Sequence, residues 1–262
     1  MMPPISPRPL CVLLSLLLLA ACSAPPPPAP PPPAAAEAAG TGPEWPAEVA
    51  AYQAEYARVQ AASAPVSLEP LFAAAEAAQG ALMKIEGEQA WIERLDEPAY
   101  ERLRAALPGL VLSRGVEIYA QPDPDALLAL AERQGGEADR AFFRLHRAYW
   151  SADLVPRYVR LRADYATPCL EYGQGELVRL YQTWSDFQRV HPQAYPAFAG
   201  QIVADMEEAI TLGTCTCNDV AGVLAEQQQW LTALPDSSVA ERVRARMQQL
   251  QTDPDAQPVW CR

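Results

Sequence analysis

Residues 23–43 read SAPPPPAPPPPAAAEAAGTGP, and this run limits what the chain can fold into more than any other feature. Of the 27 prolines in the chain, 12 lie before residue 34. Proline runs favour the extended polyproline II helix and offer no apolar face to a core. We therefore expect residues 22–43 to form a tether that reaches about 60 Å when extended. Residues 44–262 are left to form one folded domain.

The segment before this tether has the pattern of an export signal. Met1–Leu10 carries a single charge, Arg8, and Val12–Ala20 (VLLSLLLLA) carries none. Nine such residues are too few to span the roughly 30 Å hydrocarbon layer of a membrane. They suit the apolar core of a secretory signal peptide instead. Residues 1–21 are therefore predicted to be a signal peptide that is removed.

The end of this signal resembles a lipobox, the processing site of bacterial lipoprotein precursors. Leu19-Ala20-Ala21-Cys22 places small residues and then a cysteine directly after the apolar run. The resemblance implies that the chain is cut before Cys22 and that the Cys22 thiol carries a diacylglycerol anchor. Enteric lipoproteins that stay at the inner membrane have an aspartate after this cysteine. Ser23 therefore implies an outer-membrane lipoprotein that faces the periplasm.

The charge balance excludes some classes of partner. The formal net charge is −12, and a chain that begins at Cys22 loses only Arg8 and carries −13. Such a surface repels nucleic acid and anionic lipid headgroups, whereas it attracts a basic protein. We expect a basic protein partner, no nucleic acid, and contact with the membrane through the lipid anchor alone.

The motifs of common enzyme classes are missing from the sequence. The chain has two histidines and contains no Gly-x-Ser-x-Gly, His-Glu-x-x-His, P-loop or dinucleotide fingerprint. Acid–base chemistry near neutral pH would then depend on carboxylates tuned by burial. We expect a protein that is not an enzyme and that holds no cofactor and no metal.

Apolar residues recur at helical spacing through most of residues 44–262, as in Trp45, Val49, Tyr52, Tyr56 and Val59. This pattern predicts a mainly α, irregular multi-helix domain. The apolar stripes cover residues 45–59, 71–85, 100–103, 127–130, 142–150, 177–187, 198–210, 223–231 and 239–250. The predicted N-caps are Ser67, Asp96, Asp123 or Asp125, Asn218 or Asp219, and Asp236 or Ser237.

One segment has the pattern of strands. Leu110–Leu112 and Val116–Tyr119 flank a turn that contains Gly115, which predicts one short β-hairpin packed on helices. Prolines and a glycine break the helical period over residues 151–173. We expect an irregular segment there, with one short helix.

Four cysteines remain after the signal and the anchor: Cys169, Cys215, Cys217 and Cys261. An even number in an oxidising compartment indicates disulfides. Cys215 and Cys217 are separated by one residue, and a bridge between them would close a small, strained ring. Two pairings therefore stay open, Cys169–Cys215 with Cys217–Cys261, or Cys169–Cys217 with Cys215–Cys261. The alternative is a zinc, copper or redox site at Cys215-Thr216-Cys217, with help from Cys169 or His191.

A cluster of arginines is the candidate surface for a partner. Arg157, Arg160 and Arg162 lie within six residues of each other in an acidic chain, and Tyr158 lies among them. Arginine and tyrosine are enriched at interface hot spots. Pairing of these arginines with acids of the same chain is the structural alternative.

The remaining candidates have structural explanations as well. Asp205 and Glu208 share a helix face and could act as paired carboxylates of a glycosidase if they lined a cleft. His146 lies on an apolar helix face with Trp150 four residues later, which indicates a satisfied, partly buried histidine. Helix capping explains the acids at Asp123 and Asp125 better than calcium binding does.

Together these features predict a membrane-anchored periplasmic lipoprotein whose helical domain binds a protein. An inhibitor or immunity protein against a basic envelope hydrolase or toxin fits the acidity and the anchor. The alternatives are a structural or assembly lipoprotein of the envelope, and a carboxylate-based hydrolase.

Overall fold

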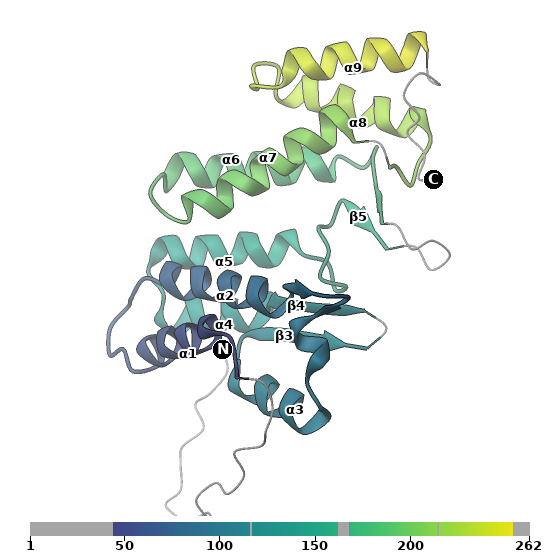
Figure 1. The fold of residues 1–262 in the computed structure, drawn as a ribbon. Helices are drawn as coiled ribbons and strands as arrows, with labels where there is room; N and C mark the ends of the chain where they lie inside the picture. Colours follow the sequence, from purple (N-terminus) through teal and green to yellow (C-terminus); the bar gives the residue numbers. More distant parts are fainter. Residues whose placement is uncertain (1–43, 116, 162–167, 214, 254–262) are drawn as a thin grey trace, which may run out of the picture. The chain divides into compact units, whose positions relative to one another are not determined.

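Helices make up most of the chain in the computed structural model, which describes residues 44–115, 117–161, 168–213 and 215–253. Nine α-helices and three two-stranded antiparallel ladders occur in these residues. Figure 1 shows α1 to α5 in the lower part of the view and α6 to α9 in the upper part. The predicted mainly α class is confirmed.

The first two helices are α1 (Ala47–Gln60) and α2 (Glu69–Leu82), and they pack against each other. The predicted stripe of α1 is buried at Val49, Tyr52 and Val59. Leu68, and not Ser67, occupies the N-cap position of α2.

The second predicted stripe was wrong at its end, because α2 stops at Leu82 and Ile85 is 71% exposed. Residues Ile85–Glu86 (β1) pair with Gln89–Ala90 (β2) in a tight hairpin. Gly87 has φ +75° in the turn, a conformation that glycine adopts without steric cost. A four-residue ladder is too short to show the alternation by which strands are found in a sequence.

A 3₁₀ helix (η1, Trp91–Arg94) and α3 (Glu97–Ala106) follow. Asp96 caps α3 as predicted, since its Oδ1 accepts a hydrogen bond of 2.7 Å from the Ala99 amide. The predicted hairpin is also confirmed: β3 (Leu110–Arg114) and β4 (Ile118–Pro122) are antiparallel, with Leu112 opposite Ala120.

Helices α4 (Pro124–Gln134) and α5 (Glu137–Tyr149) are separated by Gly135 and Gly136. Asp123 caps α4, because its Oδ1 accepts from the amides of Asp125 and Ala126, each at 3.0 Å. The expectation of a short helix over 151–173 was wrong for the described part of that segment. It contains β5 (Val159–Arg160) paired with β6 (Cys169–Leu170), so the expectation of a single hairpin was wrong too.

Four further helices complete the described chain: α6 (Glu176–Val190), α7 (Pro196–Leu212), α8 (Val220–Ala233) and α9 (Ala240–Thr252). Asp219 caps α8 by accepting from the Gly222 amide at 3.0 Å. The predicted cap of α9 was wrong, because Val239 precedes the helix. The Ser237 hydroxyl instead accepts a 3.0 Å hydrogen bond from the Trp230 indole.

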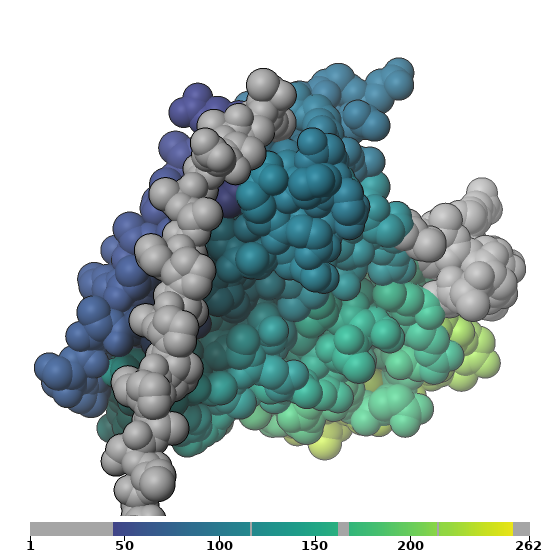
Figure 2. Space-filling view, turned by 90° about the horizontal axis from the view of Figure 1, so that it is seen from below, coloured from purple at the N-terminus to yellow at the C-terminus, as the bar shows by residue number. Residues whose placement is uncertain are grey.

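One apolar core joins these elements and is rich in aromatic rings, among them Phe72, Phe142, Tyr149, Trp184 and Trp230. A buried carboxylate ties α8 to the start of α6. Glu226 is fully buried and accepts from the amides of Gly173 and Gly175, both at 2.8 Å. Figure 2 shows one face of the molecule, on which the early residues (purple to blue) and the later ones (green to yellow) lie on different sides.

A disulfide joins Cys169 and Cys217 across 48 residues of sequence. This bridge excludes the pairing of Cys169 with Cys215. Because the sulfurs of Cys169 and Cys217 are bonded to each other, neither is a free thiolate for the alternative metal site. The second bridge, Cys215–Cys261, stays a prediction because Cys261 lies outside the described residues. The expected chain-entropy stabilisation from a loop of this length is about 4 kcal/mol.

Some of the predicted features cannot be compared with the structure because their residues are not among those it describes. The signal peptide (1–21), the anchor Cys22 and the rest of the tether (to residue 43) lie outside the described residues, as does Arg162. Among the helices that the structure does describe, none combines the length and the apolar character that a membrane crossing requires.

Candidate functional site

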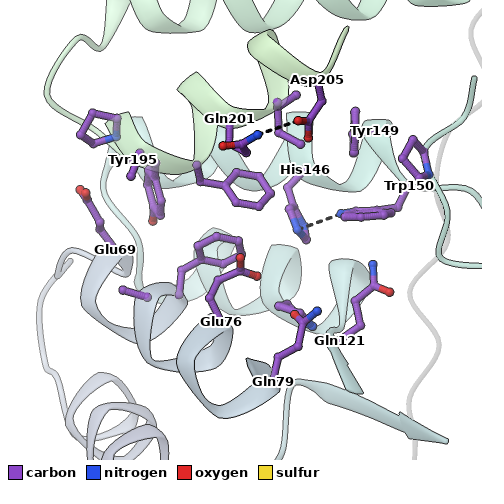
Figure 3. Close-up of a pocket in the computed structure, with 18 residues that line it drawn as sticks. Glu69, Glu76, Gln79, Gln121, His146, Tyr149, Trp150, Tyr195, Gln201 and Asp205 are labelled. Atoms are coloured by element: carbon purple, nitrogen blue, oxygen red, sulfur yellow. Dashed lines mark hydrogen bonds between the residues drawn. The ribbon is translucent and has the colours of Figure 1, made fainter. Parts of the chain in front are cut away.

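A cavity of about 640 Å³ opens between α2, α5 and α7. Figure 3 shows α2 on one side of it, α7 on the other, and His146 and Trp150 of the α5 side between them. Gln121 and Pro122 at the end of β4 also line it. Cavities of 300–1,000 Å³ are the usual size of ligand sites, which makes this the candidate functional site.

Aromatic rings form its apolar walls. Phe72 of α2 meets Phe198 of α7 edge to face, with ring centroids 4.9 Å apart. Tyr195, which precedes α7, stacks on Phe142 at 3.6 Å with the two planes 4° apart. Such ring contacts add to the gain from burial, so the walls are fixed by the core of the domain.

His146 is 1% exposed and belongs to this wall. Its Nε2 accepts a 2.9 Å hydrogen bond from the indole Nε1–H of Trp150. Indole is only a donor, so Nε2 carries no proton and the neutral ring carries its proton on Nδ1. Burial lowers the pKa of His146 to about 3, so it stays neutral at ordinary pH. Nδ1 has no hydrogen-bond partner among the described residues. The expectation of a satisfied histidine is therefore met at Nε2 only.

Three carboxylates line the same cavity: Glu69 and Glu76 from α2, and Asp205 from α7. The Gln201 amide donates to Asp205 Oδ1 at 2.6 Å. Glu76 as a whole residue is exposed, yet desolvation within the cavity raises the pKa of its carboxyl above the ordinary value. No lysine or arginine is among the described residues that line the cavity. Its electrostatic field therefore favours cations.

One buried carboxylate holds the three walls together. Asp139 of α5 is 5% exposed. Its Oδ1 accepts from the Leu68 amide at 2.9 Å, just before α2, and from the Tyr195 hydroxyl at 2.6 Å, just before α7. Its Oδ2 accepts from the Gly136 amide at 2.8 Å. Burial and the bond to Asp139 raise the pKa of Tyr195 far above its usual range.

The predicted carboxylate pair is divided between two hollows. Asp205 lines the cavity, and it also borders a second hollow of about 430 Å³ that contains Glu208 and Cys169. The sequence reasoning missed Glu76. Its signal is a second helical stripe beside the core stripe of α2, made of Glu69, Phe72, Ala73, Glu76 and Gln79.

The arginine cluster is not presented as one surface by the described residues. Tyr158 is buried, and its hydroxyl lies 3.3 Å from that of Tyr149. Arg157 Nε donates to the Ala148 carbonyl at 2.8 Å, and Arg160 is paired with Glu171. Contact of these residues with a partner stays a prediction.

Among the described residues, no group of three or more histidine, cysteine, aspartate or glutamate side chains has the arrangement of a metal site. His191 follows α6 and packs against Phe187, with ring centroids 5.3 Å apart.

Comparison with known proteins adds no assignment: no family model, curated protein or solved structure matches the chain.

Proposed function

We propose that the chain is a lipoprotein of the outer membrane that faces the periplasm and binds a basic protein, and that it is not an enzyme. The lipobox at Cys22 supports the anchor, and the net charge of −12 supports a basic partner. An inhibitor or immunity protein against a basic hydrolase or toxin is the form of this function that we favour. A structural or assembly role for the same binding domain is the alternative.

The single observation that carries the proposal is the composition of the cavity wall. Glu69, Glu76 and Asp205 surround aromatic side chains, with no cationic residue among the described lining residues. Apolar surface together with opposite charge is the combination that gives a protein interface both affinity and selectivity. A basic segment of a partner would find both in one place.

Photo-crosslinking in the native envelope tests this proposal. Ala73 lines the cavity and Ala129 lies on α4, and both are exposed alanines in helices. A photoreactive residue at position 73 should capture a protein with a basic isoelectric point, and the same residue at position 129 should not. Charge-neutral Glu76→Gln combined with Asp205→Asn should reduce the yield at position 73. Equal capture at the two positions, or capture of an acidic protein, would contradict the proposal.

One observation favours a second candidate, a carboxylate-based hydrolase. Glu76 has a raised pKa and shares the cavity with Asp205. A carboxyl of raised pKa can act as a general acid beside a second, ionised carboxylate. The hydrolase candidate predicts release of soluble fragments from purified peptidoglycan, lost in Glu76→Gln and kept in Glu137→Gln, an exposed glutamate of α5. Absence of any release by the wild type would remove this candidate.

A further inference from the structure

Trp150 is held in place at the edge of the cavity. It follows the last residue of α5, and its indole Nε1–H donates to His146 Nε2 at 2.9 Å. Its backbone forms an antiparallel bridge with Pro156. Because burial keeps His146 neutral, the acceptor of this bond persists across ordinary pH. A side chain that is fixed before binding loses little conformational entropy when a ligand arrives.

Among the residues that the structure describes, no aromatic ring lies parallel to the Trp150 indole. The ring contacts found there are with His146, inclined at 69°, and with Tyr149, inclined at 84°. The side chain is half-buried and lines the cavity. Tryptophan is the best aromatic platform for a cation, worth about 0.5–2 kcal/mol depending on how far the pair is desolvated.

The carboxylates lie on both sides of this platform. Figure 3 shows Asp205 on the α7 side and Glu76 on the α2 side of the cavity, with His146 and Trp150 between them. The amides of Gln79 and Gln121 add further planar acceptors to the lining. A cation that entered would meet an aromatic face and two negative charges at once.

From this arrangement, and resting on the proposed function, we infer that the cavity receives an arginine side chain of the basic partner. Its guanidinium stacks on one face of the Trp150 indole and pairs with the carboxylate on that side, while the carboxylate on the other side adds to the attraction at longer range. Arginine fits better than lysine because a planar, weakly hydrated guanidinium both stacks on rings and makes two parallel hydrogen bonds to a carboxylate. His146 is a positioning residue in this site, since it fixes the indole.

Small arginine analogues test the inference. The full-length protein, labelled with ¹⁵N at the indole nitrogens and held in a neutral detergent, is titrated with N-acetyl-arginine amide. The matched control is N-acetyl-citrulline amide, which has almost the same shape and no charge. The expected result is a saturable shift of the Trp150 indole signal with the arginine probe, and affinity weaker by about tenfold for citrulline. The Trp150→Phe variant assigns the signal.

Two variants separate recognition from folding. Glu76→Gln combined with Asp205→Asn should weaken binding of the arginine probe by about tenfold. The indole signals of the buried Trp184 and Trp230 should stay in place, which reports an intact core. The inference is overturned if citrulline or N-acetyl-lysine amide binds as tightly as the arginine probe, or if the arginine probe gives no saturable shift.

This test and the crosslinking experiment can fail separately. Capture of a basic protein at position 73 without binding of the arginine probe would leave the proposed function standing and remove the arginine anchor. Binding of the probe without capture of a basic protein would support the cation site and contradict the protein-binding role.

Discussion

Replacement of Asp139 by asparagine probes how the cavity is held together. The two Oδ atoms of Asp139 accept from three donors that belong to the starts of α2, α5 and α7. Asparagine has nearly the same shape but only one acceptor oxygen. If that oxygen keeps the bonds to Leu68 and Tyr195, the new NH₂ group faces the Gly136 amide, and two donors oppose each other. The two remaining bonds also lose the charge of their acceptor.

The size of the effect follows from these three bonds. A donor left without an acceptor inside a protein costs about 1–3 kcal/mol, and a bond to a charged group exceeds a neutral one by up to about 1.5 kcal/mol. Because such terms do not add fully, we expect Asp139→Asn to lower the free energy of unfolding by about 3 kcal/mol. Tyr195→Phe removes one bond only and should cost about 1–2 kcal/mol.

Urea denaturation of the full-length protein with its disulfides intact measures this loss. The control is Asp186→Asn on α6, whose carboxylate is 69% exposed and pairs with Arg189 at 3.0 Å. An exposed pair of this kind contributes about 0–1 kcal/mol. A loss below about 1 kcal/mol for Asp139→Asn, or a loss no larger than that of the control, would refute the claim that Asp139 joins the three walls.

Further predictions address the anchor, the second disulfide, the buried histidine and the charge. Cys22→Ala should abolish labelling with palmitate, whereas Cys11→Ala should retain it; persistent label on the first variant contradicts the lipobox. Peptide mapping without reduction should find Cys215 linked to Cys261, and free thiols at both would contradict that bridge. Burial lowers the pKa of His146 to about 3. Below pH 6.5 the unfolded chain therefore binds a proton that the folded chain does not. Stability should fall by about 2 kcal/mol from pH 7 to pH 5 through this group, and His146→Gln should remove that part of the pH dependence. Association with a basic partner should slow as salt rises, and a salt-independent association rate would contradict electrostatic attraction.

The helices could be predicted because their apolar stripes are local. The stripe of α1 is buried at Val49, Tyr52 and Val59. Three helices are capped by the aspartate that precedes them in sequence: Asp96, Asp123 and Asp219. The cap of α9 was not predicted correctly because a side chain of the preceding helix binds the expected capping residue. The Ser237 hydroxyl accepts a hydrogen bond from the Trp230 indole, and Val239 occupies the N-cap position of α9.

The cavity could not be predicted from the sequence, because its walls come from three separate segments. Glu76, His146 and Asp205 are up to 129 residues apart in sequence and meet only after α2, α5 and α7 have packed. Taken alone, each has an ordinary structural explanation as a helix residue. Sequence spacing pairs Asp205 with Glu208 on its own helix, whereas the carboxylates that share its cavity come from α2.

The Cys169–Cys217 bridge makes the cavity depend on the compartment in which the chain is found. The bridge closes a covalent ring that contains the whole of α6 and α7, and α7 supplies Phe198, Gln201 and Asp205 to the cavity. In a reducing cytoplasm this ring is open, and the α7 wall depends on non-covalent contacts alone. On the proposed route of export the ring closes only after the chain has crossed the inner membrane. Maturation of the binding site is then coupled to delivery, so that a chain still in the cytoplasm competes poorly for the partner.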